Sequence, residues 1–277
     1  MRLNRVLALL PILLGGCATI SPARHPVLPE GAEYVSLGSS FAAGAGIGPI
    51  QPGTPARCNR TVNNYASLLA ERRKLKLVDA SCGGARTDHV LGPWDELPPQ
   101  IDAVSTTTRL VTITIGGNDL GYVGWLFAAS CRLGVAARPG PCQAVTEPTE
   151  VAYAELDRNL RAIAVAVRER APQARLVFVQ YVTLLSAQPC DRATIAPADA
   201  AVASRIAERL AKITAQAAQA SGAEVLASDR LSRSHAPCSP TPWSNGLYSG
   251  YNMANGAPWH PNAAGHAAIA EELAELL

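Results

Sequence analysis

Short apolar runs alternate with amphipathic stretches along most of this chain, and this alternation limits the possible folds more than any other feature. The runs have strand length, and the stretches between them repeat apolar residues at helical spacing. We expect strands at residues 34–37, 75–78, 110–115, 176–181 and 224–226, and helices at 63–74, 151–170, 197–221 and 262–277. Strands separated by helices predict a mainly parallel sheet of about five strands with helices on both faces, a three-layer α/β/α sandwich.

The length, composition and charge of the chain are those of one globular domain. The 277 residues are 48% hydrophobic and 17% charged, which is enough to bury one sizeable core. The formal net charge is only +2, with Lys and Arg dispersed along the sequence. This balance argues against a nucleic-acid partner, and nothing in the sequence indicates an oligomeric state.

The N-terminal residues form a leader. Arg2 and Arg5 precede an apolar run over 6–14, which is too short to span a bilayer, and Gly-Gly-Cys17 ends the segment. This is the layout of a secretory signal, and its ending resembles a bacterial lipoprotein signal, in which the Cys is acylated and becomes the new N-terminus. We therefore predict a signal peptide over 1–17 and an exported chain held at the cell envelope through lipid on Cys17. The alternative is an ordinary cleaved signal with an incidental Cys17 and a secreted product.

A tether follows the leader. Residues 18–32 are rich in Pro and small residues and show no apolar period. The first predicted strand begins just after this segment, so we expect one folded catalytic domain over 33–277. No internal repeat or low-complexity block interrupts that domain.

The cysteines indicate disulfides. Of seven cysteines, leaving Cys17 aside gives six, an even number in a chain that the leader directs to an oxidising compartment. Spacing alone does not choose among the possible connectivities, and we predict nearest neighbours: Cys58 with Cys82, Cys131 with Cys142, and Cys190 with Cys238. Metal binding is the competing interpretation, but no Cys-x-x-Cys pair or clustered His supports it, so we expect no metal.

Functional residues should follow the strands, because parallel α/β sheets bind ligands beyond the carboxyl ends of their strands. The first predicted strand runs into Gly-Ser-Ser-Phe-Ala-Ala-Gly over 38–44. Ser40 lies there at a tight strand-to-helix turn, where its hydroxyl would be exposed beside backbone N–H groups that can stabilise an oxyanion. A serine at such a turn more often only caps the following helix, so this segment alone does not establish a nucleophile.

Two further loops follow the second and third predicted strands. Gly84 lies in Cys-Gly-Gly-Ala over 82–85 and offers an unhindered N–H, although a plain turn glycine would explain it as well. Asn118 lies in Gly-Gly-Asn-Asp over 116–119, and its side-chain amide can donate to the same oxyanion. An Asx turn that ends the strand is the alternative for Asn118.

His260 lies in Pro-Trp-His-Pro-Asn, directly before the last predicted helix. An imidazole on a Pro-stiffened loop at this edge of the sheet is suited to be a general base, because its ordinary pKa lies near neutrality. A surface histidine without a role is the alternative. His266 falls within the last helical pattern, and we interpret it as structural.

Taken together and in this order, the four loops resemble the sequence blocks of the SGNH hydrolase superfamily, the GDSL-like hydrolases. The resemblance runs from about Tyr34 to the C-terminus, and it implies a flavodoxin-like sheet. It implies Ser40 as nucleophile and His260 as its general base. It also implies an oxyanion site made by the N–H groups of Ser40 and Gly84 and the amide of Asn118, with no metal or organic cofactor.

Two departures from the family pattern matter. Ser39 stands where the family usually has Asp, which resembles actinobacterial secreted lipases and esterases with three disulfides and supports the nearest-neighbour pairing. Ala257 stands three residues before His260, where the superfamily often has an Asp that orients the imidazole. Its absence predicts a Ser-His dyad in which a backbone carbonyl, that of Ala257, accepts the other ring N–H. A distant Asp that completes a triad is the alternative.

The resemblance implies an exported serine esterase or lipase that acts on small-molecule or lipid carboxylic esters through an acyl-enzyme. Residues 121–145 and the loop before His260 are rich in aromatic residues, which either line an acyl pocket or pack their own loops. Deacetylation of a polysaccharide and acyl transfer would use the same catalytic groups. A binding module tethered to the envelope, without catalysis, is a third alternative, and Ala257 is its main support.

Overall fold

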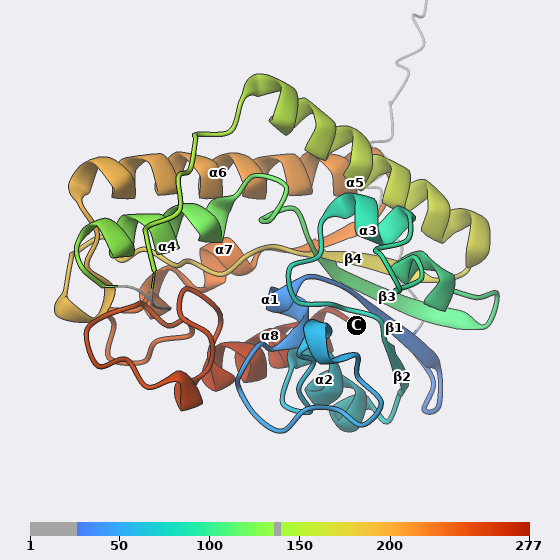
Figure 1. Cartoon of the computed structure of the whole chain (residues 1–277). Helices are drawn as coiled ribbons and strands as arrows, with labels where there is room; N and C mark the ends of the chain where they lie inside the picture. Colours follow the sequence, from blue (N-terminus) through green and yellow to red (C-terminus); the bar gives the residue numbers. More distant parts are fainter. Residues whose placement is uncertain (1–26, 136–139) are drawn as a thin grey trace, which may run out of the picture.

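The structure is a computed structural model that describes residues 27–135 and 140–277. Its centre is a five-stranded sheet in the order β2-β1-β3-β4-β5, and every pairing between these strands is parallel. The strands are β1 (Glu33–Gly38), β2 (Lys76–Asp79), β3 (Thr108–Thr114), β4 (Arg175–Val179) and β5 (Glu224–Leu226). Helices lie on both sides of this sheet, so the predicted α/β/α fold is confirmed (Figure 1).

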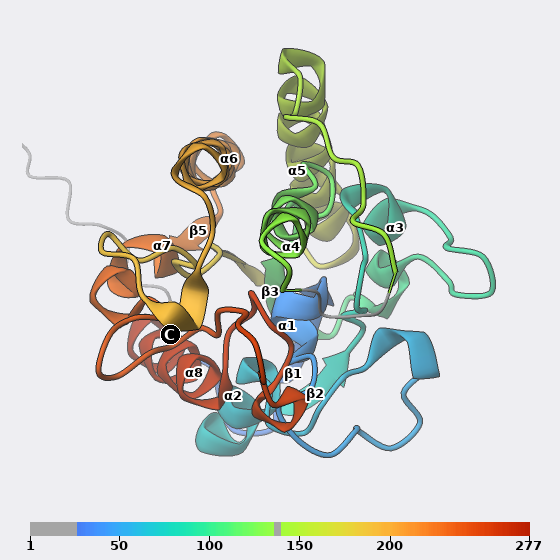
Figure 2. The same ribbon diagram turned by 60° about the vertical axis from the view of Figure 1, so that its left-hand side comes forward.

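The helices form two layers that Figures 1 and 2 show from different sides. On one face of the sheet, α2 (Tyr65–Arg73) packs against α8 (Ala263–Leu276). On the other face, α5 (Glu150–Arg170) packs against α6 (Pro197–Ala220) and α3 (Thr87–Leu91), and α4 (Tyr122–Arg132) packs against α6. The shorter helices are α1 (Ser40–Ala43) and α7 (Ser228–Leu231), with 3-10 turns at Ala56–Cys58, Gln100–Ala103, Asp191–Ala193, Arg233–His235 and Met253–Asn255.

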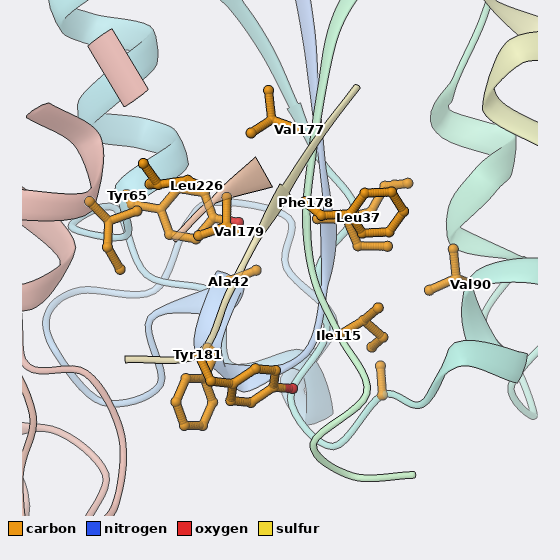
Figure 3. Packing of buried hydrophobic residues seen from close by; sticks show 14 of the residues in the cluster. Leu37, Ala42, Tyr65, Val90, Ile115, Val177, Phe178, Val179, Tyr181 and Leu226 are labelled. Atoms are coloured by element: carbon orange, nitrogen blue, oxygen red, sulfur yellow. The ribbon is translucent and has the colours of Figure 1, made fainter. Parts of the chain in front are cut away.

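The core lies on both faces of the central strands. Strands β1, β3 and β4 are almost entirely buried, which explains why they appear in the sequence as continuous apolar runs. Successive side chains of a strand point to opposite faces. In Figure 3, Phe178 lies with Leu37 on the side of the sheet that faces Val90 of α3, while Val179 points to the side of Tyr65.

The main helices begin close to their predicted positions because local capping defines their first turns. The Asn64 side chain accepts from the Ser67 N–H at 2.8 Å before α2, and the Asn262 side chain accepts from the Gly265 N–H at 2.9 Å before α8. Pro197 opens α6 at a position where a missing N–H costs nothing.

Helix α4 is the longest element that the sequence analysis did not assign. It occupies part of the aromatic segment 121–145, and it begins after Gly121, which has a φ of 61°. Most of its side chains are buried, so its apolar residues do not form the single stripe that identifies a surface helix.

Strand order brings two of the predicted loops together. The strand order reverses between β1 and β3, and ligands of open α/β sheets bind at such a point. The segments that follow these two strands are therefore neighbours. The N–H of Ser39 after β1 donates to the carbonyl oxygen of Thr114 at the end of β3, at 2.9 Å.

Three disulfides hold the outer loops. They join Cys58 to Cys82, Cys131 to Cys142 and Cys190 to Cys238, which are the nearest-neighbour pairs. The first attaches the loop after β2 to the segment before α2, and the third attaches the chain after β4 to the loop between α7 and α8.

The predicted signal peptide over 1–17, with Cys17, lies outside the described residues, as do residues 18–26 of the predicted tether. In the two ranges that are described, no helix combines the length and the apolar character needed to cross a bilayer.

Candidate active site

The turn that carries Ser40 is built around a glycine at the end of β1. Gly38 has a φ of 134°, and a Cβ atom there would lie 2.4 Å from the carbonyl oxygen of Thr114. The buried side chain of Gln100 bonds to both backbone groups of Gly38, since it accepts from the Gly38 N–H at 2.7 Å and donates to the Gly38 carbonyl at 3.0 Å. Ser40 is the first residue of α1, and the Ser39 side chain forms no capping hydrogen bond to that helix.

The structure brings Ser40 and His260 into contact. The Ser40 Oγ and the His260 Nε2 lie 2.8 Å apart, although the residues are 220 positions apart in the chain. The His260 Nδ1 lies 2.8 Å from the carbonyl oxygen of Pro258. A carbonyl can only accept, so Nδ1 carries the proton and Nε2 is free to accept from the serine hydroxyl.

The carbonyl that orients His260 is that of Pro258, and the prediction of Ala257 was wrong. Trp259 has a φ of 56°, in the left-handed region, so the chain turns sharply between Pro258 and His260 and brings the Pro258 carbonyl to the ring. The Ala257 carbonyl accepts instead from the Asn245 side chain at 3.4 Å. Trp259 is fully buried and its indole N–H donates to the Ser130 Oγ at 3.1 Å, which holds this unusual backbone conformation in place.

The imidazole of His260 is buried. Burial lowers the pKa of His260 to about 4, and the hydrogen bond to the Pro258 carbonyl opposes that shift only in part. The ring is therefore neutral at pH 7, which is the state a general base needs. Within residues 27–135 and 140–277, no carboxylate pairs with His260, whose ring nitrogens contact only Ser40 and Pro258.

The predicted oxyanion donors lie on loops that are bonded, directly or through one another, to the turn that carries Ser40. Among the described residues, the N–H groups of Ser40 and Gly84 have no acceptor. Gly84 has a φ of 85° and is exposed, and its neighbour Cys82 donates through its N–H to the Gly38 carbonyl at 2.9 Å. The Asn118 amide donates one hydrogen to the Ala85 carbonyl at 2.9 Å, which fixes the amide and leaves its second hydrogen available.

Asp119 joins the Gly84 loop to the Asn118 loop, and the sequence analysis did not assign it a role. Its carboxylate accepts from the Thr87 N–H at 3.1 Å and from the Thr87 hydroxyl, which also accepts from the Asn159 amide at 2.9 Å. Burial raises the pKa of Asp119, and its hydrogen bonds to Thr87 oppose that change. A carboxylate directly after Asn118 was the one signal that would have indicated this link.

The aromatic residues near the site divide between packing and cavity lining. Trp259 is buried in the loop, and the indole N–H of Trp125 donates to the Asp199 carbonyl at 3.2 Å. Tyr248 and Tyr251 line a cavity of about 240 Å³ together with Met253. Trp259 and Trp125 thus contribute to packing, whereas Tyr248 and Tyr251 line a hollow.

Comparison with known proteins identifies the family. A model of the GDSL-like lipase/acylhydrolase family matches residues 36–268, which include all four loops. The chain belongs to this family. This confirms the resemblance that the four loops indicated, and it makes the chain a carboxylic ester hydrolase.

Several Streptomyces proteins resemble this GDSL-like hydrolase. It is 31% identical to Lipase 2 of Streptomyces coelicolor over 256 residues, which cover 88% of this chain and 85% of the relative. The crystal structure of an extracellular lipase from Streptomyces rimosus matches with a TM-score of 0.67 at 24% identity, over 87% of this chain and 98% of that one. A phospholipase A1 from Streptomyces albidoflavus matches with a TM-score of 0.69 at 23% identity, over the same shares. The two structural matches show that the GDSL-like chain has the fold of these enzymes.

Proposed function

We propose that this protein hydrolyses acyl or lipid esters with Ser40 as nucleophile and His260 as general base. The observation that carries the proposal is the 2.8 Å hydrogen bond between the Ser40 Oγ and the His260 Nε2. That distance lies within the range over which a base takes a proton from a nucleophile. The names of the relatives, lipases and a phospholipase A1, support an ester of a fatty acid as the substrate.

In the proposed reaction, His260 takes the hydroxyl proton while the Ser40 oxygen attacks the ester carbonyl. The N–H groups of Ser40 and Gly84 and the Asn118 amide stabilise the oxyanion that forms. The protonated imidazole then gives its proton to the leaving alcohol. In the second half, His260 takes a proton from water, the hydroxide attacks the acyl-enzyme, and Ser40 regains its proton as the free acid leaves.

The catalytic pair works as a dyad in this proposal. The Pro258 carbonyl fixes the tautomer and the orientation of the ring, which a carboxylate does in a triad. A neutral carbonyl stabilises the imidazolium less than a carboxylate would. Burial lowers the pKa of His260 to about 4, and the Pro258 carbonyl opposes that shift only in part.

We also propose that the protein is exported and that residues 1–17 are a signal peptide, residues 18–32 a tether and residues 33–277 the catalytic domain. Three disulfides are typical of an oxidising compartment, and the similar lipase from Streptomyces rimosus is extracellular. Acylation of Cys17 would hold the mature protein at the membrane surface. Growth with a labelled fatty acid tests this, since the wild-type protein should take up label and the Cys17→Ala variant should not.

The decisive experiment on the dyad compares two serine variants. A fluorophosphonate should label the wild-type protein at Ser40, and Ser40→Ala should abolish both labelling and ester hydrolysis. Ser36→Ala is the matched control, because Ser36 is buried in β1 and its hydroxyl has no hydrogen-bond partner among the described residues. Hydrolysis that persists in Ser40→Ala would show that the nucleophile lies elsewhere.

The substrate class is tested on the wild-type enzyme. Nitrophenyl esters of increasing acyl length, a phosphatidylcholine and an acetylated oligosaccharide should be compared by kcat/KM. We expect long-chain esters or the phospholipid to be preferred. A preference for the acetylated sugar would identify a deacetylase instead.

A further inference from the structure

A buried phenol lies between the two turns that carry the candidate nucleophile and the oxyanion amide. Tyr181 follows β4 at the carboxyl edge of the sheet (Figure 3), and the residue is only 8% exposed. Its hydroxyl oxygen accepts from the Gly117 N–H at 2.9 Å and lies 3.2 Å from the Ser39 Oγ. Gly117 directly precedes Asn118 and Ser39 directly precedes Ser40, so one hydroxyl contacts both turns.

The hydrogen bonds around Tyr181 form one chain with a single consistent direction. The Gly117 N–H donates to Tyr181, so the Tyr181 hydroxyl can donate to the Ser39 Oγ, and the Ser39 hydroxyl donates to the Thr114 carbonyl at 3.4 Å. Each hydroxyl hydrogen is used once. Burial raises the pKa of Tyr181, so the phenol stays protonated and remains a donor at any pH of interest.

The ring of Tyr181 contacts the same two turns. Its centroid lies 4.3 Å from that of Phe41, and the Phe41 ring lies 4.8 Å from the imidazole of His260. On the other side, a Cβ atom at Gly117 would lie 2.6 Å from the Tyr181 ring, so the ring packs directly against that peptide. Both the hydroxyl and the ring therefore define the gap between the turns.

We propose that Tyr181 is a positioning residue for ester hydrolysis, whose phenol hydroxyl sets the separation of the Ser39-Ser40 turn from the Gly117-Asn118 turn. The inference rests on the proposed function, because it assumes that Ser40 attacks the ester and that Asn118 stabilises the oxyanion. Oxyanion donors act only when they are held at the position that the developing charge will occupy. Loss of the hydroxyl should therefore slow the chemical step more than it weakens substrate binding.

The test removes only the hydroxyl, in Tyr181→Phe. We expect kcat to fall about tenfold, equivalent to about 1.4 kcal/mol, while KM changes less than about twofold. Tyr34→Phe is the matched control: Tyr34 is also buried and its hydroxyl bonds to the Thr112 Oγ1 at 2.7 Å, on strands of the same sheet but away from both turns. It should lower thermal stability comparably and leave kcat unchanged.

Loss of folding is separated from loss of positioning by counting active sites. The burst of a fluorophosphonate titration gives the concentration of competent Ser40, and kcat is expressed per titrated site. A tenfold lower kcat per site in Tyr181→Phe supports the inference. A kcat per site within twofold of wild type overturns it.

A double-mutant cycle tests the chain of hydrogen bonds. Ser39→Ala removes the next hydroxyl, so the double variant Ser39→Ala/Tyr181→Phe should lose about as much kcat as the stronger single variant. Losses that multiply would show that the two hydroxyls act separately, and would overturn the inference. Activity that survives in Ser40→Ala would refute the proposed function itself, whatever the Tyr181 variants show.

Discussion

The two members of the proposed catalytic pair, Ser40 and His260, are supported in different ways. Ser40 lies on a nucleophile turn, residues 38–44, that is bonded directly to the sheet through Thr114 and to the buried side chain of Gln100. His260 lies on a histidine loop, residues 232–262, whose middle pairs with its C-terminal end, as in the bonds from the Asn245 N–H to the His260 carbonyl and from the Trp259 N–H to the Asn245 carbonyl. The proposed nucleophile is thus positioned by the core of the fold, and the proposed base by a loop that is attached to that core at separate points.

Several bonds attach the histidine loop to the rest of the fold, among them those from the Ala257 N–H to the Ala45 carbonyl at 3.0 Å and from the Thr183 N–H to the Ser232 Oγ at 2.7 Å. The Trp259 indole bonds to Ser130 of α4, the Ser244 hydroxyl bonds to the Thr183 carbonyl at 2.7 Å, and a disulfide holds Cys238. Loosening the loop should therefore misplace the imidazole while the sheet stays folded. Damage to the nucleophile turn should spread into the sheet itself.

The largest effect is expected when the base is removed. His260→Ala should lower kcat on the order of a thousandfold, because general-base catalysis by a well-placed imidazole contributes that much. His235→Ala is the matched control, since His235 lies in the same loop, stacks on Trp243 and bonds to Thr241. It should leave kcat within about threefold of wild type. Comparable losses in both variants would mean that the loop, and not the imidazole, is required.

Removal of one disulfide at a time should distinguish contacts that position the histidine loop from contacts that only stabilise the fold. Replacing Cys190 and Cys238 by Ser opens a loop of 48 residues and should cost about 4 kcal/mol of unfolding free energy, against about 3 kcal/mol for the 11-residue loop of Cys131 and Cys142. Urea unfolding measures both. The first change should lower kcat more, because Cys238 lies in the histidine loop, whereas Cys131 reaches that loop only through its neighbour Ser130 on α4. Equal losses of kcat would contradict this division of support.

Removal of the Asn118 amide, the proposed oxyanion donor, tests the part of the site that the sheet supports. Asn118→Ala should lower kcat about a hundredfold, or about 2.7 kcal/mol, with little change in stability. Asn63→Ala is a fair control, because the Asn63 amide also donates to a backbone carbonyl, that of Ile47 at 3.1 Å, on a loop outside the site. A loss below about threefold in Asn118→Ala would deny the amide a role in the transition state.

The same division explains what the sequence predicts well. Strands and main helices follow from apolar periodicity, and the loops after β1, β2 and β3 carry recognisable residues because the sheet itself brings their ends together. Gln100 and Tyr181 could not be found this way. Each contacts the nucleophile turn across more than 60 residues, and neither lies in a motif.

The error at Ala257 has a similar cause. Which carbonyl reaches His260 depends on the left-handed φ of Trp259, a conformation that residues with a Cβ rarely adopt. Burial of the Trp259 indole and its hydrogen bond to Ser130 of α4 stabilise that conformation. These tertiary interactions cannot be read from the local sequence. A loop that is positioned by distant contacts is therefore harder to predict than a turn at the end of a strand.

The smallest expected effect is on the pH dependence of kcat/KM. It tests whether the His260 imidazole is shielded from water. With a pKa of about 4, His260 is almost fully neutral at both pH 7 and pH 5, so kcat/KM should differ less than about twofold between them. An imidazole of ordinary pKa, about 6.5, would lose about twentyfold over this interval. Activity should then rise with pH only through about 4.

The free energy of unfolding must be measured in the same experiment, because it falls with decreasing pH, as activity does. The pKa of His260 is lower in the folded chain than in the unfolded one, so the unfolded chain binds more protons below pH 6.5 and stability falls as the pH drops from 6.5 toward 4. Rates are therefore taken per titrated Ser40 site. If kcat/KM per site fell with an apparent pKa near 6.5, water or a carboxylate would reach the imidazole in solution, and the base would be less isolated than its loop makes it.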